Sequence, residues 1–300
     1  MTTANDAIRA RRRPLAILGV WAWQTTLAWL ASWPAASLVR ATYGNDPRGD
    51  GVLWTPGSHA LLEFLWREAH GVSAAVRGAA GVLLVGAVTG LVPLAALMVT
   101  MAGAGGAPRG RSGRGIAETL RVLPAMTLLL FVMTAGQALA LGAGAFAGEL
   151  AEGWTLTGLG EARAQQLGLA LGMPFLILAV AIGVTHDLAR AAVVRGASGG
   201  MRALALGVTE FGAAPVSLGW AWAWRAAGAL MPVIVVGAVA GRLGARGGAA
   251  LVLLALLHQG VVLGRVALRA SWLAATLRRM PGDAHWLRAE ADPYFDPSTR

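Results

Sequence analysis

The hydrophobic positions of the chain gather into six long stretches that polar segments separate. A helix rises about 1.5 Å per residue and the hydrocarbon core of a bilayer is about 30 Å thick, so a span needs about 20 mostly apolar residues. The stretches that meet this length are roughly 15–39, 79–104, 123–147, 167–189, 214–241 and 248–270. They predict an all-α polytopic membrane protein, a six-transmembrane-helix bundle that forms one domain over 1–300 and leaves a short tail at 271–300.

Composition agrees with lipid as the solvent, because 56% of the residues are apolar and only 13% are charged. A soluble chain of this length carries roughly twice that charge. The net charge of +10 raises the question of nucleic acid. No basic stripe or aromatic platform accompanies the charge, so we expect no nucleic-acid partner. The absence of cysteine excludes disulfides, thiolate metal sites and cysteine nucleophiles.

The arginines are distributed unevenly between the two sides of these spans. Of the 25 basic residues, all of them arginine, 17 fall on the side that holds both termini and seven on the other, while Arg225 lies inside a span. Cytoplasmic loops carry the excess of basic residues, so both termini are expected in the cytoplasm. The start "RRRPLAILGV" resembles a secretory or twin-arginine signal, but its apolar run is too long and rich in tryptophan. An uncleaved first span is therefore favoured.

The loop between the first two spans contains an amphipathic pattern, "PGSHALLEFLWREAHG". It predicts an outer helix over 58–70, capped by Ser58. Leu61, Leu62 and Leu65 share one face of this helix, which we expect to lie against the membrane or the bundle.

The polar face of the same helix offers a weak metal candidate. His59, Glu63 and His70 are residue types that bind metals, and two of them lie one turn apart. The alternative is an ordinary surface helix with an i,i+4 pair between Glu63 and Arg67. The alternative is favoured, because no recognised metal motif is present.

The stretch "GWAWAWRAAGALMP", 219–232, places Arg225 among tryptophans. One interpretation is an interfacial anchor, in which Trp220 and Trp224 lie at headgroup depth and the arginine extends towards water. The other keeps Arg225 inside the bundle and pairs it with Asp187 or Glu210, because an unpaired charge in lipid is costly. The anchor is favoured.

Further polar residues lie at the ends of the fourth and last spans. Asp187 and Arg190 are three residues apart and can pair within a polar elbow. In the last span, His258, Arg265, Arg269 and Trp272 form one stripe. The two arginines either mark the cytoplasmic end of the helix or meet Asp187 and Glu210. His258 is expected to be buried and hydrogen-bonded to a neighbouring helix, because polar groups are costly near the middle of the membrane.

No catalytic constellation accompanies these residues. The chain has no nucleotide-binding loop, serine elbow or carboxylate pair. His186 and His258 lie at different depths, which argues against a shared haem. Glu149, Glu152 and Glu161 fall in a short outer loop after the third span, where a solvated face explains them. We therefore expect no enzyme, no cofactor and no catalytic residue.

The segments "DLARAAVVRG…MRALALGV" and "HQGVVLGRVALRASWLAATLRR" resemble a broad group of six-span bacterial inner-membrane proteins. That group is similar to the membrane domain attached to some glycerophosphodiester phosphodiesterases. The resemblance covers most of the chain by layout, but about 50 residues carry its motifs. It implies a six-helix bundle in the bacterial inner membrane. It transfers no catalytic residue, and this chain has no phosphodiesterase domain.

Two classes of function remain open. The first is a non-enzymatic membrane component that binds a partner or belongs to the cell envelope, with the lipid bilayer and other membrane proteins as its partners. The second is a permease for a small solute or lipid. Permeases usually show broken helices and polar groups near the midplane. The candidates for such features are Pro174, Pro232, His258 and Arg225.

Overall fold

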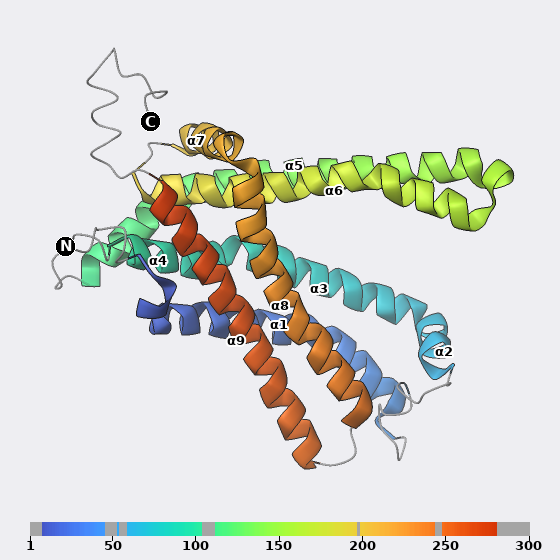
Figure 1. Cartoon of the computed structure of the whole chain (residues 1–300). Helices are drawn as coiled ribbons and strands as arrows, with labels where there is room; N and C mark the ends of the chain where they lie inside the picture. The colour runs from blue at the N-terminus through green and yellow to red at the C-terminus, as the bar shows by residue number, and fades with distance from the viewer. Residues whose placement is uncertain are drawn as a thin grey trace. The chain divides into compact units, whose positions relative to one another are not determined.

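The computed structural model describes residues 8–45, 53, 59–103, 112–196, 199–243 and 248–280. These residues form an all-α structure, without a strand in the described ranges, and the order of the elements is shown in Figure 1. The elements are the 3-10 helix η2 (Ala10–Arg12), α1 (Pro14–Tyr43), α2 (Ala60–Arg67), α3 (Ala69–Thr89), α4 (Leu91–Ala102), α5 (Ser112–Leu159), α6 (Glu161–Val194), α7 (Gly200–Ala213), α8 (Pro215–Leu243) and α9 (Gly248–Arg279).

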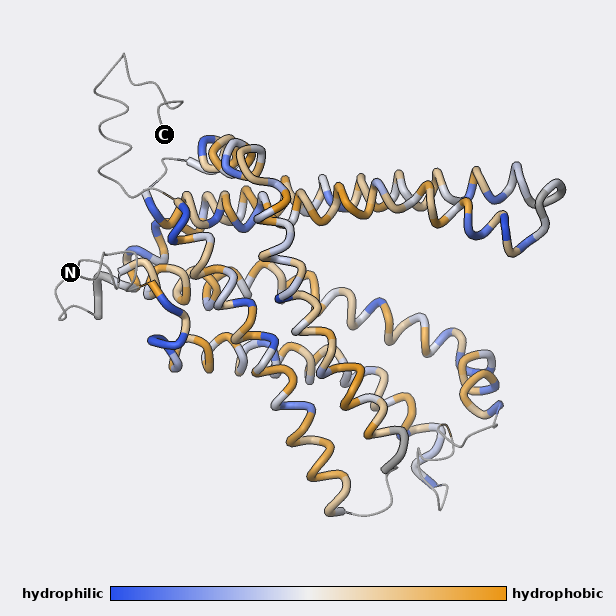
Figure 2. The backbone as a smooth tube through the Cα atoms, viewed as in Figure 1, coloured by the Kyte–Doolittle hydropathy of each residue, from blue (hydrophilic) through white to orange (hydrophobic). Residues whose placement is uncertain are grey.

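Six segments of this structure are long and apolar enough to cross a membrane, which confirms the predicted all-α multi-pass class. Each overlaps one of the six predicted stretches, and apolar residues dominate their length in Figure 2. Most are longer than predicted, because the helices continue past the apolar residues into polar ones. The segments are Pro14–Tyr43, Ala69–Ala102, Gly115–Thr155, Glu161–Val194, Pro215–Ala240 and Gly248–Arg279.

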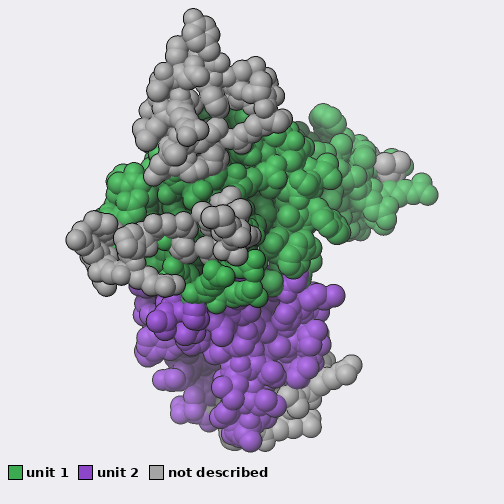
Figure 3. Space-filling view, turned by 60° about the vertical axis from the view of Figure 1, so that its left-hand side comes forward, with its two compact units in different colours: residues 1–13, 95–227, 268–300 green, residues 14–94, 228–267 purple. Residues whose placement is uncertain are grey.

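The chain forms two compact units, coloured separately in Figure 3. Unit 1 comprises Met1–Arg13, Ala95–Ala227 and Leu268–Arg300, and unit 2 comprises Pro14–Leu94 and Gly228–Ala267. The helices α4, α8 and α9 each begin in one unit and end in the other. Each unit is assembled from separate segments of the chain, so the units are not two consecutive domains. The single domain over 1–300 stays a prediction.

In unit 2, α1 and α3 approach each other through small residues of α3. A Cβ added at Gly86 would lie 2.7 Å from Leu27 Cδ1, and one added at Gly71 would lie 2.8 Å from Leu38 Cδ1. The second span is interrupted after Thr89, where α3 ends. Pro93 explains this break, because proline has no N–H and its ring clashes with the carbonyl four residues earlier.

In unit 1, α5 and α6 form a long antiparallel hairpin that turns at Gly160, with a φ of +77° (Figure 1). Glycines lie at their contact, since a Cβ at Gly148 would be 3.1 Å from the Gly168 carbonyl oxygen and one at Gly144 would be 2.8 Å from Phe175 Cβ. Small residues at this spacing let two helix backbones approach closely in lipid. The expected outer loop at 148–166 is therefore wrong: the helices continue through it almost to the turn.

The outer amphipathic segment also differs from the prediction. Ser58 lies outside the described residues, and the helix over 58–70 divides at Glu68 into the end of α2 and the start of α3. Phe64 fixes α2, because it is buried and its ring lies 5.7 Å from that of Tyr43. Of the three leucines, Leu62 and Leu65 are exposed, and their contact with the membrane stays a prediction.

Candidate functional site

The C-terminal end of α6 is buried. Each residue from 184 to 194 is buried, including the polar His186, Asp187 and Arg190. Helix α7 contributes to this burial, because a Cβ at Gly207 would lie 2.8 Å from the Thr185 carbonyl oxygen and 2.9 Å from the Ala189 nitrogen. Only glycine allows the two backbones to approach so closely. The sequence thus places a charged segment where a helix is normally apolar all round.

Asp187 is the centre of a group of side chains from α6 and α9, all within unit 1. Arg269 donates two hydrogen bonds to it, from Nη1 to Oδ2 at 2.6 Å and from Nη2 to Oδ1 at 2.5 Å. Trp272 donates its Nε1–H to Oδ2 at 2.8 Å. Arg190 adds an ion pair, with Nη1 3.6 Å from Oδ1. The side chain of Asp187 is only 2% exposed, so these donors replace its lost hydration.

We call this group the Asp187 cluster; its members are His186, Asp187, Arg190, Arg269 and Trp272. Some buried polar atoms of the cluster make no hydrogen bond to the described residues. The Arg190 side chain is 8% exposed, and its Nε is buried without a hydrogen-bond partner among the described residues. The same holds for His186 Nε2. Buried polar groups are usually satisfied, so these two atoms need an explanation.

Arg225 lies beside this cluster without joining a carboxylate. Its guanidinium carbon is 4.4 Å from the ring centroid of Trp224 and 5.8 Å from that of Trp272. Its Nη1 donates to the Ala221 carbonyl, and in the described part of the chain no carboxylate lies within ion-pair distance of it. The pairing with Asp187 or Glu210 is therefore absent. The exposure of Trp220 and Trp224 agrees with the interfacial anchor.

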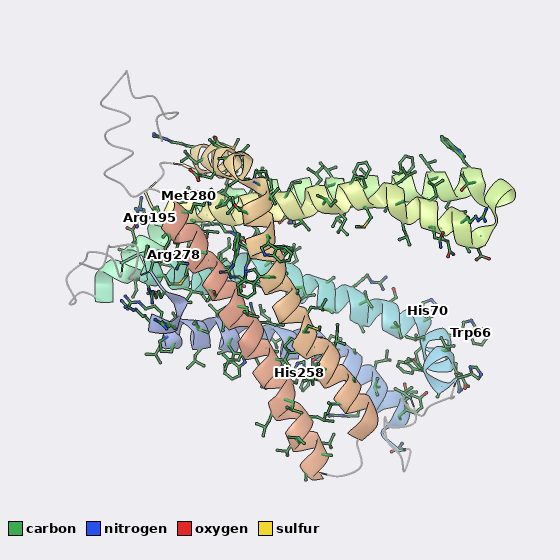
Figure 4. The ribbon with its side chains drawn as sticks, viewed as in Figure 1. Trp66, His70, Arg195, His258, Arg278 and Met280 are labelled. Atoms are coloured by element: carbon green, nitrogen blue, oxygen red, sulfur yellow. The ribbon has the colours of Figure 1, made fainter. Side chains whose placement is uncertain are left out.

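Three more arginines form hydrogen bonds or ion pairs at the C-terminal end of α9. Figure 4 labels two of them, Arg195 and Arg278, together with Met280. Arg279 pairs with Glu210 of α7 at 3.3 Å, and Arg278 donates to the Ile8 carbonyl at 2.7 Å. Arg195, just after α6, donates to the Met280 carbonyl at 3.3 Å. Sequence reasoning missed Arg195 and Arg278, because their acceptors are backbone carbonyls that no sequence pattern marks.

The other predicted residues of α9 do not join the cluster. Arg265 and His258 are exposed, and both belong to unit 2. The expected hydrogen bond of His258 is wrong for the described residues. Its neighbour Gln259 makes the link to another helix, accepting from the Thr25 hydroxyl at 3.3 Å. The two side chains are about 100° apart on a helix, so only one of them faces α1.

The metal candidates are divided between two helices. His59 precedes α2 and Glu63 lies on it, whereas His70 lies on α3 beyond the break at Glu68 (Figure 4). Glu63 pairs with Arg67 at 3.5 Å, as an ordinary surface helix requires. In the ranges that the structure describes, no group of three histidine or acidic residues could hold a metal ion.

No protein-family model, curated protein or solved structure matches this chain. The class of the protein is defined by its fold and by its buried cluster. It is an all-α multi-pass membrane protein with one carboxylate held among arginines.

Proposed function

We propose that this chain is a non-enzymatic component of the bacterial inner membrane that binds another protein of the cell envelope, with both termini in the cytoplasm. The arginine asymmetry of 17 to seven supports the orientation. One observation carries the binding role: the α5–α6 hairpin is much longer than a membrane is thick.

The lengths of α5 and α6 indicate which residues of the hairpin extend beyond the membrane. Helix α5 has 48 residues and α6 has 34, which correspond to about 72 Å and about 51 Å. The apolar part of α6, 167–184, is about 27 Å long and by itself matches the hydrocarbon core. Residues 149–163, here called the outer arm, then extend roughly 10–16 Å beyond it.

The surface of the outer arm suits recognition of a protein. Trp154 is 81% exposed, Glu161 is exposed beside the turn, and Glu149 is exposed where the arm begins on α5. An exposed tryptophan provides the large apolar contact that dominates many interfaces. The acidic residues favour a partner with a basic rim, because complementary charges guide association.

The Asp187 cluster supports a structural role rather than a catalytic one. Both oxygens of Asp187 already accept hydrogen bonds from Arg269, and Oδ2 accepts a second one from Trp272. A general base needs a free oxygen within reach of the proton that it removes. Pro174 and Pro232 give a permease no support, because α6 and α8 continue without interruption through them, and the break between α3 and α4 lies in the second span instead. The resemblance to six-span inner-membrane proteins, which we also propose as kinship, likewise implies no catalytic residue.

Site-specific photo-crosslinking in intact cells tests the proposal. A photoreactive residue at Trp154 should give one discrete adduct, and the double variant Glu149→Arg/Glu161→Arg should weaken it severalfold. The matched control is the same probe at Phe146, which is also exposed on α5 but lies within the apolar span. A discrete adduct from Trp154 alone supports the arm as the binding element. Equal adducts from both positions, or none from Trp154, contradict it.

A further inference from the structure

Positive charge exceeds negative charge around Asp187. Arg190 and Arg269 both pair with this one carboxylate, and Arg225 lies against Trp272, which is itself bonded to Asp187. Glu210 of α7 pairs with Arg279 instead. In the described part of the chain, two guanidinium groups thus pair with one carboxylate, and a third lies against the tryptophan that is bonded to it. An excess of positive charge destabilises a folded protein where solvent is limited, unless a bound anion neutralises it.

Donors are also in excess at this place. Among the described residues, Arg190 Nε and Arg225 Nε are buried donors without a hydrogen-bond partner. Arg190 is more than nine-tenths buried, so water in bulk does not solvate it. Each arginine carries five N–H donors in a planar fork that fits the oxygens of carboxylate and phosphate groups. The N–H groups without an acceptor and the excess positive charge therefore both favour an oxyanion as the ligand.

The cluster lies where the apolar stretches of the sequence end. The apolar stretch of α6 ends at Val184, and the polar Thr185, His186 and Asp187 follow. In α8 the apolar stretch lies on the other side of Arg225, from Ala226 onward. The Arg269 side chain is 43% exposed and Arg225 is half-buried, so a ligand can reach both from outside. Charged residues at the edge of a span are where arginine meets lipid headgroups.

We propose that Arg190, Arg225 and Arg269 form a binding site for a phosphate group, supplied either by an anionic lipid headgroup or by free phosphate. Asp187 and Trp272 position Arg269 and Arg225, and the phosphate oxygens accept hydrogen bonds from guanidinium N–H groups that make no bond to Asp187. Trp224 covers Arg225 from the other side by a cation–π contact. This inference does not depend on the partner proposed for the outer arm.

Binding to the purified full chain in detergent tests the site with three probes: short-chain phosphatidylglycerol, the diacylglycerol with the same acyl chains, and inorganic phosphate. We expect saturable binding of phosphatidylglycerol, detected by native mass spectrometry and by a rise in the unfolding temperature, with at most weak binding of diacylglycerol. Arg225→Gln should weaken this binding roughly tenfold or more, because a charge-assisted hydrogen bond is lost. The variant should stay folded, since Arg225 makes none of the bonds to Asp187.

The control is Arg163→Gln, which makes the same charge change on an exposed residue at the far end of α6. It should bind like the wild type. Binding of inorganic phosphate that Arg225→Gln weakens assigns the site to free phosphate, and binding of phosphatidylglycerol alone assigns it to the headgroup. Equal binding of phosphatidylglycerol and diacylglycerol would overturn the site, as would an equal loss in both variants, unchanged binding in Arg225→Gln, or no binding of either phosphate probe.

Discussion

At the scale of single residues, Asp187 holds together side chains that would otherwise repel one another. Arg190 and Arg269 are both cationic and both lie within ion-pair distance of its oxygens. Through Trp272 the same carboxylate also links α9 to the buried end of α6. The contribution of Asp187 therefore comes from the charges that it neutralises as much as from its own hydrogen bonds.

Replacing Asp187 should destabilise the protein strongly. Asp187→Ala leaves Arg190 buried with no counter-ion, and we expect a loss of roughly 3–5 kcal/mol in the free energy of unfolding. Unfolding in detergent, followed by circular dichroism, measures it. Glu149→Ala removes an exposed carboxylate of α5 and should change stability by less than about 0.5 kcal/mol. Equal stability of the two variants would mean that the cluster does not hold the helices together.

At the scale of helices, the sequence predicts the spans well and their ends poorly. Lipid demands about 20 apolar residues per span, and that demand is visible in the pattern. The continuation of α5 to Leu159 was missed, because residues after Gly148 are too polar for a span while still able to form a helix. The pairing of Arg269 with Asp187 was foreseen only as one of two alternatives. Partners that lie 82 residues apart are joined by packing, which no local pattern reports.

Two glycines of α7 test how closely this helix packs on the cluster. Gly207→Ala would place a Cβ within 2.9 Å of two backbone atoms of α6, whereas Gly212→Ala meets nothing within 4 Å. Alanine favours a helix over glycine by about 1 kcal/mol, so Gly212→Ala should be neutral or stabilising. Gly207→Ala should instead cost roughly 1–3 kcal/mol, because the helices must move apart. A stabilising Gly207→Ala in the same unfolding measurement would show that α7 does not pack tightly on α6.

At the scale of the whole molecule, the account depends on which side of the membrane each segment occupies. The excess of arginines near both termini supports our proposal that those segments lie in the cytoplasm, and an even number of spans in the described residues keeps them on one side. In this proposed orientation the outer arm lies on the opposite side, where a partner of the envelope can reach Trp154. Helix α7 and the arginines at the C-terminal end of α9 then lie on the cytoplasmic side.

Labelling of single cysteines in intact cells tests this arrangement most directly, because the chain has no cysteine of its own and the background is therefore zero. Trp154→Cys and Met201→Cys both replace exposed side chains, one on the outer arm and the other on α7. A thiol reagent that reaches the outer face of the membrane that holds the chain, but does not cross that membrane, should label Trp154→Cys at once and Met201→Cys only after the membrane is opened. Labelling of Met201→Cys in intact cells, or protection of Trp154→Cys, would contradict the orientation and with it the proposed role of the arm.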